Sequence, residues 1–376
     1  MMSLTTELKS FAEEVGFDIA RVTSAESFSE AADRIKKQIR LGFKPMVRVE
    51  DIDAYCNPRS VLPDAKSILV VAECYLASGP VDLSKPGDPH GRIARYTWSN
   101  YYYDVKKKLK TVARFLKKKV GAGFRFKYFS NGPLAEKPMA ERAGVGWYGK
   151  HGIVVTERFG SWIVLGELIT NVKLEEDEPI KGLCGGCQAC VEACPTKALV
   201  KPYILDVSKC LQYVSNHQMV IPEYMRELWG NRLYGCTTCQ EACPINRRVK
   251  PKDWRPSYGY IGPSLSLVEI LRMKDDEYRR RFHRNQIGHQ WVSFRAIQRN
   301  AAVAFGNIGD PIDIPALSQT LESNRSIIVR MHAAWALGKI GGQEAKLALE
   351  KTLRRNPRPE VKREIVNAIR RLEANV

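Results

Sequence analysis

The cysteines constrain this chain more than any other feature. Eight of its ten cysteines lie between residues 184 and 243, and the stretch CGGCQACVEACP begins at Cys184. Its spacing, C-x2-C-x2-C-x3-C-P, is typical of one half of a bacterial ferredoxin, in which three thiolates surround one 4Fe-4S cubane and the fourth binds a second cubane. Four more thiolates are then required. We therefore predict a small ferredoxin-like domain that folds around two clusters.

The remaining thiolates are present in a second, looser run. Cys210 is followed, after an insertion, by CTTCQEACP, which begins at Cys236. Exchange of the fourth cysteine between the two halves predicts two ligand sets. The first cluster would be bound by Cys184, Cys187, Cys190 and Cys243, and the second by Cys194, Cys210, Cys236 and Cys239.

Other uses of cysteine fit less well. Zinc also binds CxxC pairs, but the x2, x2, x3, Pro pattern is that of an iron-sulfur cluster. The N-terminal residues have no secretion-signal features, so we expect a cytoplasmic protein with reduced thiols rather than a disulfide scaffold. Cys74 lies in an apolar run and is expected to be a buried apolar residue, whereas Cys56 carries no decisive signal.

Residues 1–177 read as an α/β domain. The runs SILVVAECYL (67–76) and GIVVTERFGSWIVLGELIT (152–170) predict buried or half-buried strands. Residues 101–120 predict an amphipathic helix whose other faces carry seven lysines and one arginine. These cations form either a solvated helix surface or a phosphate-binding face. The predicted apolar face of this helix consists of Val105, Leu109, Val112, Leu116 and Val120.

The C-terminal part contains an internal repeat. Residues 297–309, 329–341 and 361–373 superpose with an offset of 32, so that Ala304, Ala336 and Ala368 correspond. Small residues at one position and large apolar ones at the next are typical of stacked helix pairs, and the pattern resembles HEAT repeats. We thus predict a multidomain α/β protein with three domains: residues 1–177, a ferredoxin-like domain at 178–256, and an all-α, HEAT-like domain at 257–376.

The net charge points to an anionic partner. Lys and Arg outnumber Asp and Glu by 59 to 41, and the formal net charge is +18. Such an excess would attract nucleic acid, although it would also serve as a solubilising surface charge. Since no apolar run approaches the roughly 18 residues that span a bilayer, we expect no membrane association.

A protein that only carried electrons would not need such long flanks around its clusters. We therefore expect a redox cofactor or substrate site in the first domain. The candidate segment is SNGPLAEKPMAERAGVGWYGKHGIV (130–154), whose glycines suit either close approach to a bulky ligand or simple turns. His151 in this segment is, as a lone histidine, more typical of a hydrogen-bonded structural residue than of a metal ligand.

Three segments in this order resemble the cobalamin-dependent epoxyqueuosine reductase family. They are GPLAEKPMAERAGVGWYGK, CGGCQACVEACPTKAL and GNRLYGCTTCQEACPIN (230–246), and a short HEAT-like tail follows them. The resemblance covers essentially the whole chain. It implies a nitroreductase-like, cobalamin-binding domain, two 4Fe-4S clusters, and reduction of epoxyqueuosine to queuosine in the anticodon stem-loop of tRNA, the last step of queuosine biosynthesis.

The resemblance also implies particular cofactors, partners and contacts. The cobalamin would be base-off, and an external low-potential donor would supply electrons through the clusters. The basic repeats would help to bind tRNA, and a monomer is expected because the enzyme must bind a whole tRNA. The cobalamin-binding positions implied are Arg59, Thr97, Trp98, Ser130, Asn131, Lys150 and His151.

Two departures fall where the family carries catalytic groups. Ser130 stands where the family has an aspartate that donates a proton, and ARYTWSNYYYDV (94–105) lacks the family's glycine, aspartate and histidine. An alcohol cannot replace a carboxylic acid as proton donor near neutral pH. Either another group near Ser130 donates the proton, or the protein is a paralogue that reduces another substrate, as reductive dehalogenases do, or an electron-transfer protein without catalysis. The candidate donors are Tyr101, Tyr102, Tyr103 and Glu136.

Overall fold

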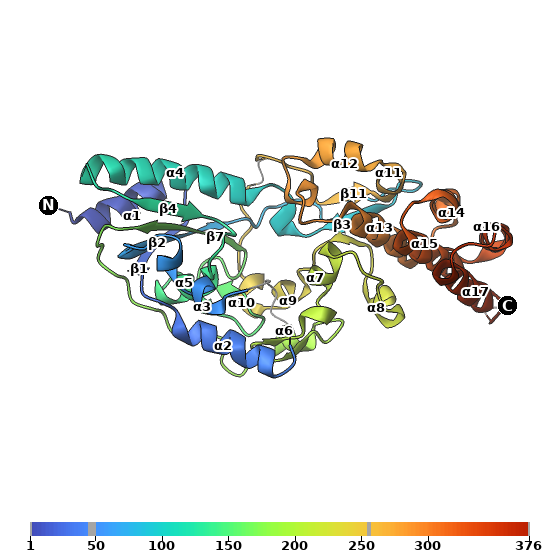
Figure 1. The fold of residues 1–376 in the computed structure, drawn as a ribbon, viewed down its shortest axis with the longest axis horizontal. Helices are drawn as coiled ribbons and strands as arrows, with labels where there is room; N and C mark the ends of the chain where they lie inside the picture. The colour runs from blue at the N-terminus through green and yellow to red at the C-terminus, as the bar shows by residue number, and fades with distance from the viewer. Residues whose placement is uncertain (1, 44–49, 254–256, 375–376) are drawn as a thin grey trace. The chain divides into compact units, whose positions relative to one another are not determined.

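The computed structural model describes residues 2–43, 50–253 and 257–374 (Figure 1). The chain forms two compact units, each built from separate stretches of sequence. The first contains residues up to Ser78, Asn100–Ser208 and Thr238–Tyr258, and the second contains Gly79–Ser99, Lys209–Thr237 and the residues from Gly259 onward. The domain boundaries expected after residues 177 and 256 stay predictions, and the second adjoins residues outside the described ranges.

A four-stranded antiparallel sheet forms the centre of the first unit. Its order is β1-β2-β7-β4, and β2 pairs with β7 from Ser67↔Thr170 to Cys74↔Ile163. Both central strands are almost wholly buried, as their apolar runs predict. The strands are β1 (Ile19–Ser24), β2 (Ser67–Cys74), β4 (Phe126–Phe129) and β7 (Ile163–Thr170).

Helices cover both faces of this sheet (Figure 1). On one face, α4 (Tyr101–Val120) packs on β7 and on α1 (Leu4–Glu14). The contact with β7 is close, because a Cβ at Gly166 would lie 2.4 Å from Val105 Cγ1. The predicted apolar face of α4 is confirmed for Val105, Leu109, Val112 and Leu116, which are buried, but Val120 is exposed at the end of the helix. The opposite face carries α3 (Ile52–Tyr55) and α5 (Glu136–Arg142).

The rest of the first unit is made of short elements. α2 (Ser29–Arg40) precedes α3, and a two-stranded hairpin of β5 (Trp147–Tyr148) and β6 (Val154–Val155) follows α5. The cysteine-rich segments contribute α6 (Ala189–Glu192), α9 (Thr238–Glu241) and α10 (Pro244–Arg247), and the pair β8 (Leu199–Lys201) and β9 (Ile204–Leu205) follows α6.

The second unit is dominated by stacked helices, which confirms the predicted HEAT-like repeat. Residues Phe294–Ile308, Ile327–Ile340 and Pro359–Ala374 form α13, α15 and α17, and each packs against the next. Glycines 32 residues apart allow this approach: a Cβ at Gly306 would lie 2.9 Å from Ala336 Cα, and one at Gly338 would lie 2.8 Å from Ala368 Cα. The other helices are α7 (Leu211–Asn216), α8 (Glu223–Leu228), α11 (Leu267–Arg272), α12 (Asp275–Phe282), α14 (Ile314–Ser323) and α16 (Gly342–Arg354).

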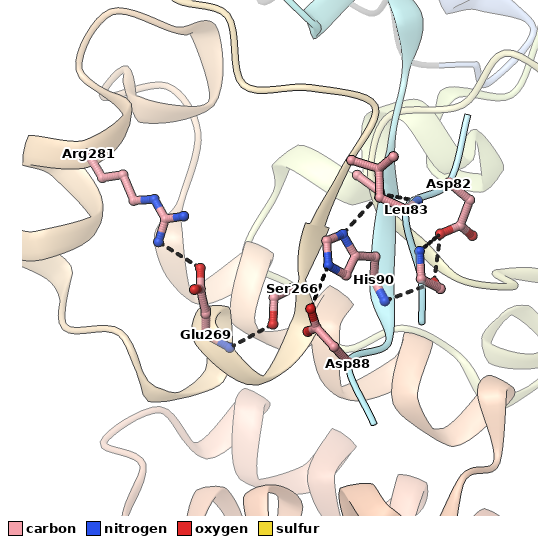
Figure 2. Close-up of polar contacts among 9 residues, drawn as sticks. Asp82, Leu83, Asp88, His90, Ser266, Glu269 and Arg281 are labelled. Carbon is pink, nitrogen blue, oxygen red and sulfur yellow. Dashed lines mark hydrogen bonds and ion pairs between the residues drawn. The ribbon is translucent and has the colours of Figure 1, made fainter. Parts of the chain in front are cut away.

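A three-stranded sheet, β10-β3-β11, completes the second unit. Side chains hold β3 (His90–Ile93) to β11 (Ser264–Ser266), because the His90 ring lies 3.1 Å from Ser264 Oγ. The same ring lies 3.2 Å from Asp88 Oδ2 (Figure 2). Ser264 is buried and accepts a hydrogen bond from the Leu83 N–H at 2.8 Å. The Ser264 hydroxyl is therefore already engaged in two contacts within the sheet. We infer that the Asp88, His90 and Ser264 side chains together stabilise the pairing of these strands. The third strand is β10 (Arg232–Tyr234).

No helix within the described ranges is long and apolar enough to cross a membrane.

Candidate functional site

The four cysteines predicted to bind the first cluster lie together in the first unit. Cys190 is in α6, and Cys243 directly precedes α10. Burial raises the pKa of the Cys190 thiol, and the neighbouring Cys243, Cys184 and Cys187 raise it further. All ten cysteines are described, and all are free of disulfides. Thiols gathered in this way are a suitable ligand set for a 4Fe-4S cubane.

Lys150 fixes the loop that carries two of these cysteines. Its Nζ donates hydrogen bonds to the carbonyl oxygens of Gly185, at 2.6 Å, and Cys187, at 2.8 Å. Gly185 has a φ of 44°, in the left-handed region that favours glycine. The Gly-rich segment that precedes Lys150 is thereby tied to the cysteine loop, and the resemblance-based assignment of Lys150 to cobalamin stays a prediction.

Gln240 and Asn246 connect the cysteine-rich segments to the sheet domain. Gln240 Nε2 lies 3.0 Å from Tyr75 Oη and 2.8 Å from the Ser161 carbonyl oxygen. Asn246 Oδ1 accepts the Ser161 N–H at 2.7 Å, and its Nδ2 donates to Ser161 Oγ at 2.8 Å. All four residues are buried. Both side chains belong to the motif CQEACPIN, so these motif residues act through packing and hydrogen bonding as well as through the thiolates beside them.

The second predicted ligand set is divided between the two units. Cys194 and Cys239 belong to the first unit, and Cys210 and Cys236 to the second. Within the described residues, no three His, Cys, Asp or Glu side chains gather tightly enough to hold one metal ion. A cubane spreads its four thiolates over four irons. The pairing of thiolates with two clusters therefore stays a prediction.

Two carboxyl groups lie in the interior of the first unit. Glu167, in β7, is 2% exposed, and among the described residues its Oε1 has no hydrogen-bond partner. Burial raises its pKa well above the ordinary value, and the charge of Glu136 adds to this effect. Burial also raises the pKa of Glu136 to about 7. Glu167 is not among the residues predicted from the sequence, although a single acidic residue in the apolar run IVLGELIT was a usable signal.

Ser130 directly follows β4 and is close to Glu136 in the chain. Its side chain is buried, and Oγ donates a hydrogen bond to the Leu165 carbonyl oxygen at 2.6 Å. Asn131 follows with a φ of 55°, which turns the chain toward α5. The Gly132 N–H then donates to Glu136 Oε1 at 3.2 Å. The expected donor position thus holds an engaged alcohol, and Glu136 is the nearest acid along the chain.

His151 is a buried histidine with one unused nitrogen. Nδ1 accepts the Ile153 N–H at 3.2 Å, whereas Nε2 has no hydrogen-bond partner in the described part of the chain. Burial, and then the charge of Lys137, lowers the pKa of His151 to about 4. The imidazole is therefore neutral at physiological pH.

Among the other positions assigned to cobalamin, some side chains have hydrogen-bond partners within the described part of the protein and others do not. Arg59 Nε lies 3.5 Å from the Ala65 carbonyl oxygen, and Trp98 Nε1 donates to the Ile93 carbonyl oxygen at 2.9 Å. Thr97 and Trp98 are buried in the second unit, and Thr97 Oγ1 is a further buried atom without a partner among the described residues. In the first unit, the orphaned Nε2 of His151 is a buried polar atom of the kind that a polar ligand would satisfy.

The three tyrosines at the start of α4 have different surroundings. Tyr101 contacts the Tyr75 ring at 5.7 Å between centroids, and Tyr103 stacks on Tyr258 at 3.9 Å. Tyr103 is 42% exposed, whereas Tyr101 and Tyr102 are half-buried. Packing explains Tyr101 and Tyr103, and their expected part in proton donation stays a prediction.

Three glycines of the 130–154 segment lie against other atoms of the protein, with no room for a side chain. A Cβ at Gly146 would lie 2.3 Å from the Val155 carbonyl oxygen, and one at Gly144 would lie 2.1 Å from that of Glu178. A Cβ at Gly132 would similarly lie 2.5 Å from Phe129 Cβ. At these three positions, the absence of a side chain makes room for the protein's own atoms, a use beyond the two that were predicted.

Comparisons with known proteins agree with this architecture. Residues 183–246 match a family model described as a 4Fe-4S double cluster binding domain, and residues 292–370 match HEAT repeats. Residues 56–131 match a family model described as epoxyqueuosine reductase, DUF1730. The epoxyqueuosine reductase of Bacillus subtilis is 34% identical over 99% of this chain and 97% of its own length. The chain belongs to the epoxyqueuosine reductase family.

Solved structures of epoxyqueuosine reductases share the fold. A Bacillus subtilis structure with its catalytic aspartate loop swung out of the active site has a TM-score of 0.89 and 33% identity, and covers 98% of this chain and 99% of that chain. An epoxyqueuosine reductase bound to an epoxyqueuosine-modified tRNA-Tyr stem loop has a TM-score of 0.89 and 32% identity, with the same coverage. The predicted architecture, with a mixed α/β region, a 4Fe-4S domain and HEAT-like helices, is therefore confirmed.

Proposed function

We propose that this protein is an epoxyqueuosine reductase that acts on tRNA. We also propose that two 4Fe-4S clusters are bound by the two sets of cysteines predicted from the spacing. The observation that carries the proposal is the gathering of Cys184, Cys187, Cys190 and Cys243 beside a domain that holds a buried acid pair. Lys150 of that domain donates two hydrogen bonds to the loop that carries Cys184 and Cys187. The full-length similarity to epoxyqueuosine reductases supplies the substrate.

The reaction removes the epoxide oxygen as water. Two C–O bonds break and a C=C bond forms, and two electrons and two protons are consumed. Bound cobalamin would supply a strongly reducing cobalt centre for this chemistry. The chain's own residues would contribute the thiolates that hold the clusters, the orphaned Nε2 of His151 as a cofactor contact, and a proton donor. A low-potential one-electron donor would supply the electrons in two steps.

A positive surface would hold the tRNA. Lys106, Lys107, Lys110, Lys117 and Lys118 of α4 are exposed, and the net charge of the chain is +18. Contacts between such side chains and phosphates weaken steeply as salt increases, because counterions are released on binding. The related enzyme bound to a modified tRNA-Tyr stem loop supports this choice of partner.

The direct test uses protein reconstituted under anaerobic conditions with iron, sulfide and cobalamin. About eight irons, four for each cubane, and one corrinoid are expected per chain. Incubation with epoxyqueuosine tRNA and a low-potential reductant should then yield queuosine. A Cys243→Ser variant should lose about four irons and the activity together. Full cofactor loading without queuosine would favour a paralogue with another substrate, and a chain that binds no corrinoid would favour an electron carrier.

A further inference from the structure

The two interior carboxyl groups have no part in carrying electrons, and their positions suggest another role. Strand alternation separates Gly166, which faces α4, from Glu167, which projects from the opposite face of the sheet. α5, which begins at Glu136, packs on β7. The two carboxyl groups therefore meet in the layer between α5 and the sheet.

Only one member of the pair has a route to the surface. Glu167 is 2% exposed, whereas Glu136 is half-buried beneath the turn that contains Asn131 and Pro133, both of which are exposed. Backbone N–H groups of Asn131 and Gly132 donate to the Glu136 carboxyl group and fix its orientation. Glu136 is thus the member of the pair that lies nearer the surface, and Glu167 is the more deeply buried one.

The surroundings of the two carboxyl groups raise the pKa of each and so favour the protonated forms. Burial is the main cause that raises both pKa values, and the two backbone N–H groups and Lys137 oppose it at Glu136. Burial, followed by the charges of Glu136, Cys56, Tyr148 and Glu167, raises the pKa of Tyr55 to about 12. Lys137 itself is engaged, since its Nζ donates to the Gly152 carbonyl oxygen at 2.6 Å. Two buried carboxylates side by side are unfavourable, so the pair gives up one proton more easily than two.

We propose that Glu136 and Glu167 form a pair of proton-donating carboxyl groups. Glu136 transfers a proton to the substrate, and the neighbouring Glu167 retains a second proton. This inference rests on the proposed function, which requires two protons for the departing oxygen. Glu136 transfers one proton to that oxygen and becomes a carboxylate. Glu167 or solvent then returns a proton to Glu136, and the electrons come from the external one-electron donor through the clusters. The pair compensates for the alcohol at Ser130.

The protonation of Glu167 is tested by infrared spectroscopy of the cluster-loaded protein. At about pH 8, an unperturbed glutamate is ionised. The wild-type protein should nevertheless show a protonated-carboxyl C=O band that shifts in D2O. Glu167→Gln should remove the band, and Glu157→Gln, at an exposed position, should retain it. In Glu136→Gln, the band should disappear at a lower pH than in the wild type, because the charge of Glu136 is gone. The proposal would be overturned if the wild-type protein lacked the band, or if the band persisted in Glu167→Gln.

The role of Glu136 is tested by turnover. Glu136→Gln should lower kcat for queuosine formation by on the order of 10²- to 10⁴-fold, the usual effect of losing a general acid. Glu157→Gln should match the wild type. The wild-type kcat should fall as pH rises through about 7, since the donor must be protonated. A Glu136→Gln rate within about twofold of wild type, or a kcat that does not fall above neutral pH, would contradict the role.

The two proposals can fail separately. If neither the wild type nor Glu157→Gln forms queuosine despite full cofactor loading, the proposed function is wrong. The infrared band then decides on its own whether Glu136 and Glu167 hold a proton together.

Discussion

Asn246 and Ser161, 85 residues apart in the chain, form a reciprocal pair of hydrogen bonds. Asn246 also donates to the Gln240 carbonyl oxygen at 2.7 Å, directly after Cys239. A single amide therefore joins the cysteine-rich segment to the turn before β7. Gly160 makes room for it, because a Cβ there would lie 2.1 Å from Asn246 Oδ1.

Loss of this amide should loosen the cluster segment. Asn246→Ala would leave the buried Ser161 N–H without a partner, which should cost about 1 to 3 kcal/mol. The Ser161 hydroxyl would keep only the hydrogen bond from Gln240 Nε2, at 3.1 Å. We expect a lower unfolding temperature and faster loss of iron to a chelator. Arg248→Ala, two residues further on at an exposed position, is the matched control. Equal iron retention in the two variants would argue against the role of Asn246.

An acid at position 130 should rescue a protein that lacks Glu136. The Ser130 side chain faces the Leu165 carbonyl oxygen, so an aspartate there would be favoured in its protonated form. Ser130→Asp alone should change kcat little, whereas Ser130→Asp combined with Glu136→Gln should restore queuosine formation at least about tenfold over Glu136→Gln. The measurement is single-turnover kinetics, with Ser130→Ala in the Glu136→Gln background as control. Equal rates in the two double variants would show that position 130 cannot deliver a proton.

His151 should make the protein sensitive to acid. Its pKa in the folded protein is about 4, below the value of about 6.5 for a free histidine, so the unfolded chain takes up a proton first as pH falls. The stability contributed by the neutral, buried ring is complete above about pH 6.5 and is lost toward pH 4, with a limit of about 3 kcal/mol.

The measurement for His151 is the unfolding temperature at several pH values. His151→Gln should flatten the decline between about pH 6.5 and 4. His217→Gln is the control, because His217 is exposed. A wild-type curve that runs parallel to that of His151→Gln would contradict the assignment.

A buried ion pair holds the repeat helices to α8. Arg226 donates to both carboxyl oxygens of Glu364, and both residues are buried. Glu364→Ala would leave the guanidinium without its counter-charge, at a cost of about 3 to 5 kcal/mol. Thermal unfolding should show a large decrease in midpoint for Glu364→Ala and almost none for Glu360→Ala, an exposed residue of the same helix. Similar midpoints for the two would exclude a stabilising role for the pair.

Features with a strict period or spacing could be predicted from the sequence. The offset of 32 between Ala304, Ala336 and Ala368 gave the repeat, since identical helix contacts recur in a solenoid. The ferredoxin spacing gave the cluster domain, because each thiolate must meet one cubane. The apolar runs around Leu69 and Leu168 gave the two central strands.

Contacts between distant segments could not be predicted in the same way. In the sequence, Glu167 is only a single acidic residue within an apolar strand. Its proximity to Glu136 arises from tertiary packing, which no local sequence pattern predicts. The glycines at 144 and 146 suited either a close ligand or a turn, and only the fold shows that they accommodate carbonyl groups of the chain itself. The division into two units follows packing rather than chain order, so residues 79–99 belong with the helical repeats.

The most direct measurement is made on tRNA from cells. A bacterial strain without its own epoxyqueuosine reductase, supplied with cobalamin, would express this chain, and its tRNA nucleosides would be analysed by mass spectrometry. The account predicts that queuosine, lighter by one oxygen atom, replaces epoxyqueuosine, and that Glu136→Gln leaves epoxyqueuosine in place. Persistent epoxyqueuosine in cells that accumulate the wild-type protein with its iron and corrinoid would contradict it.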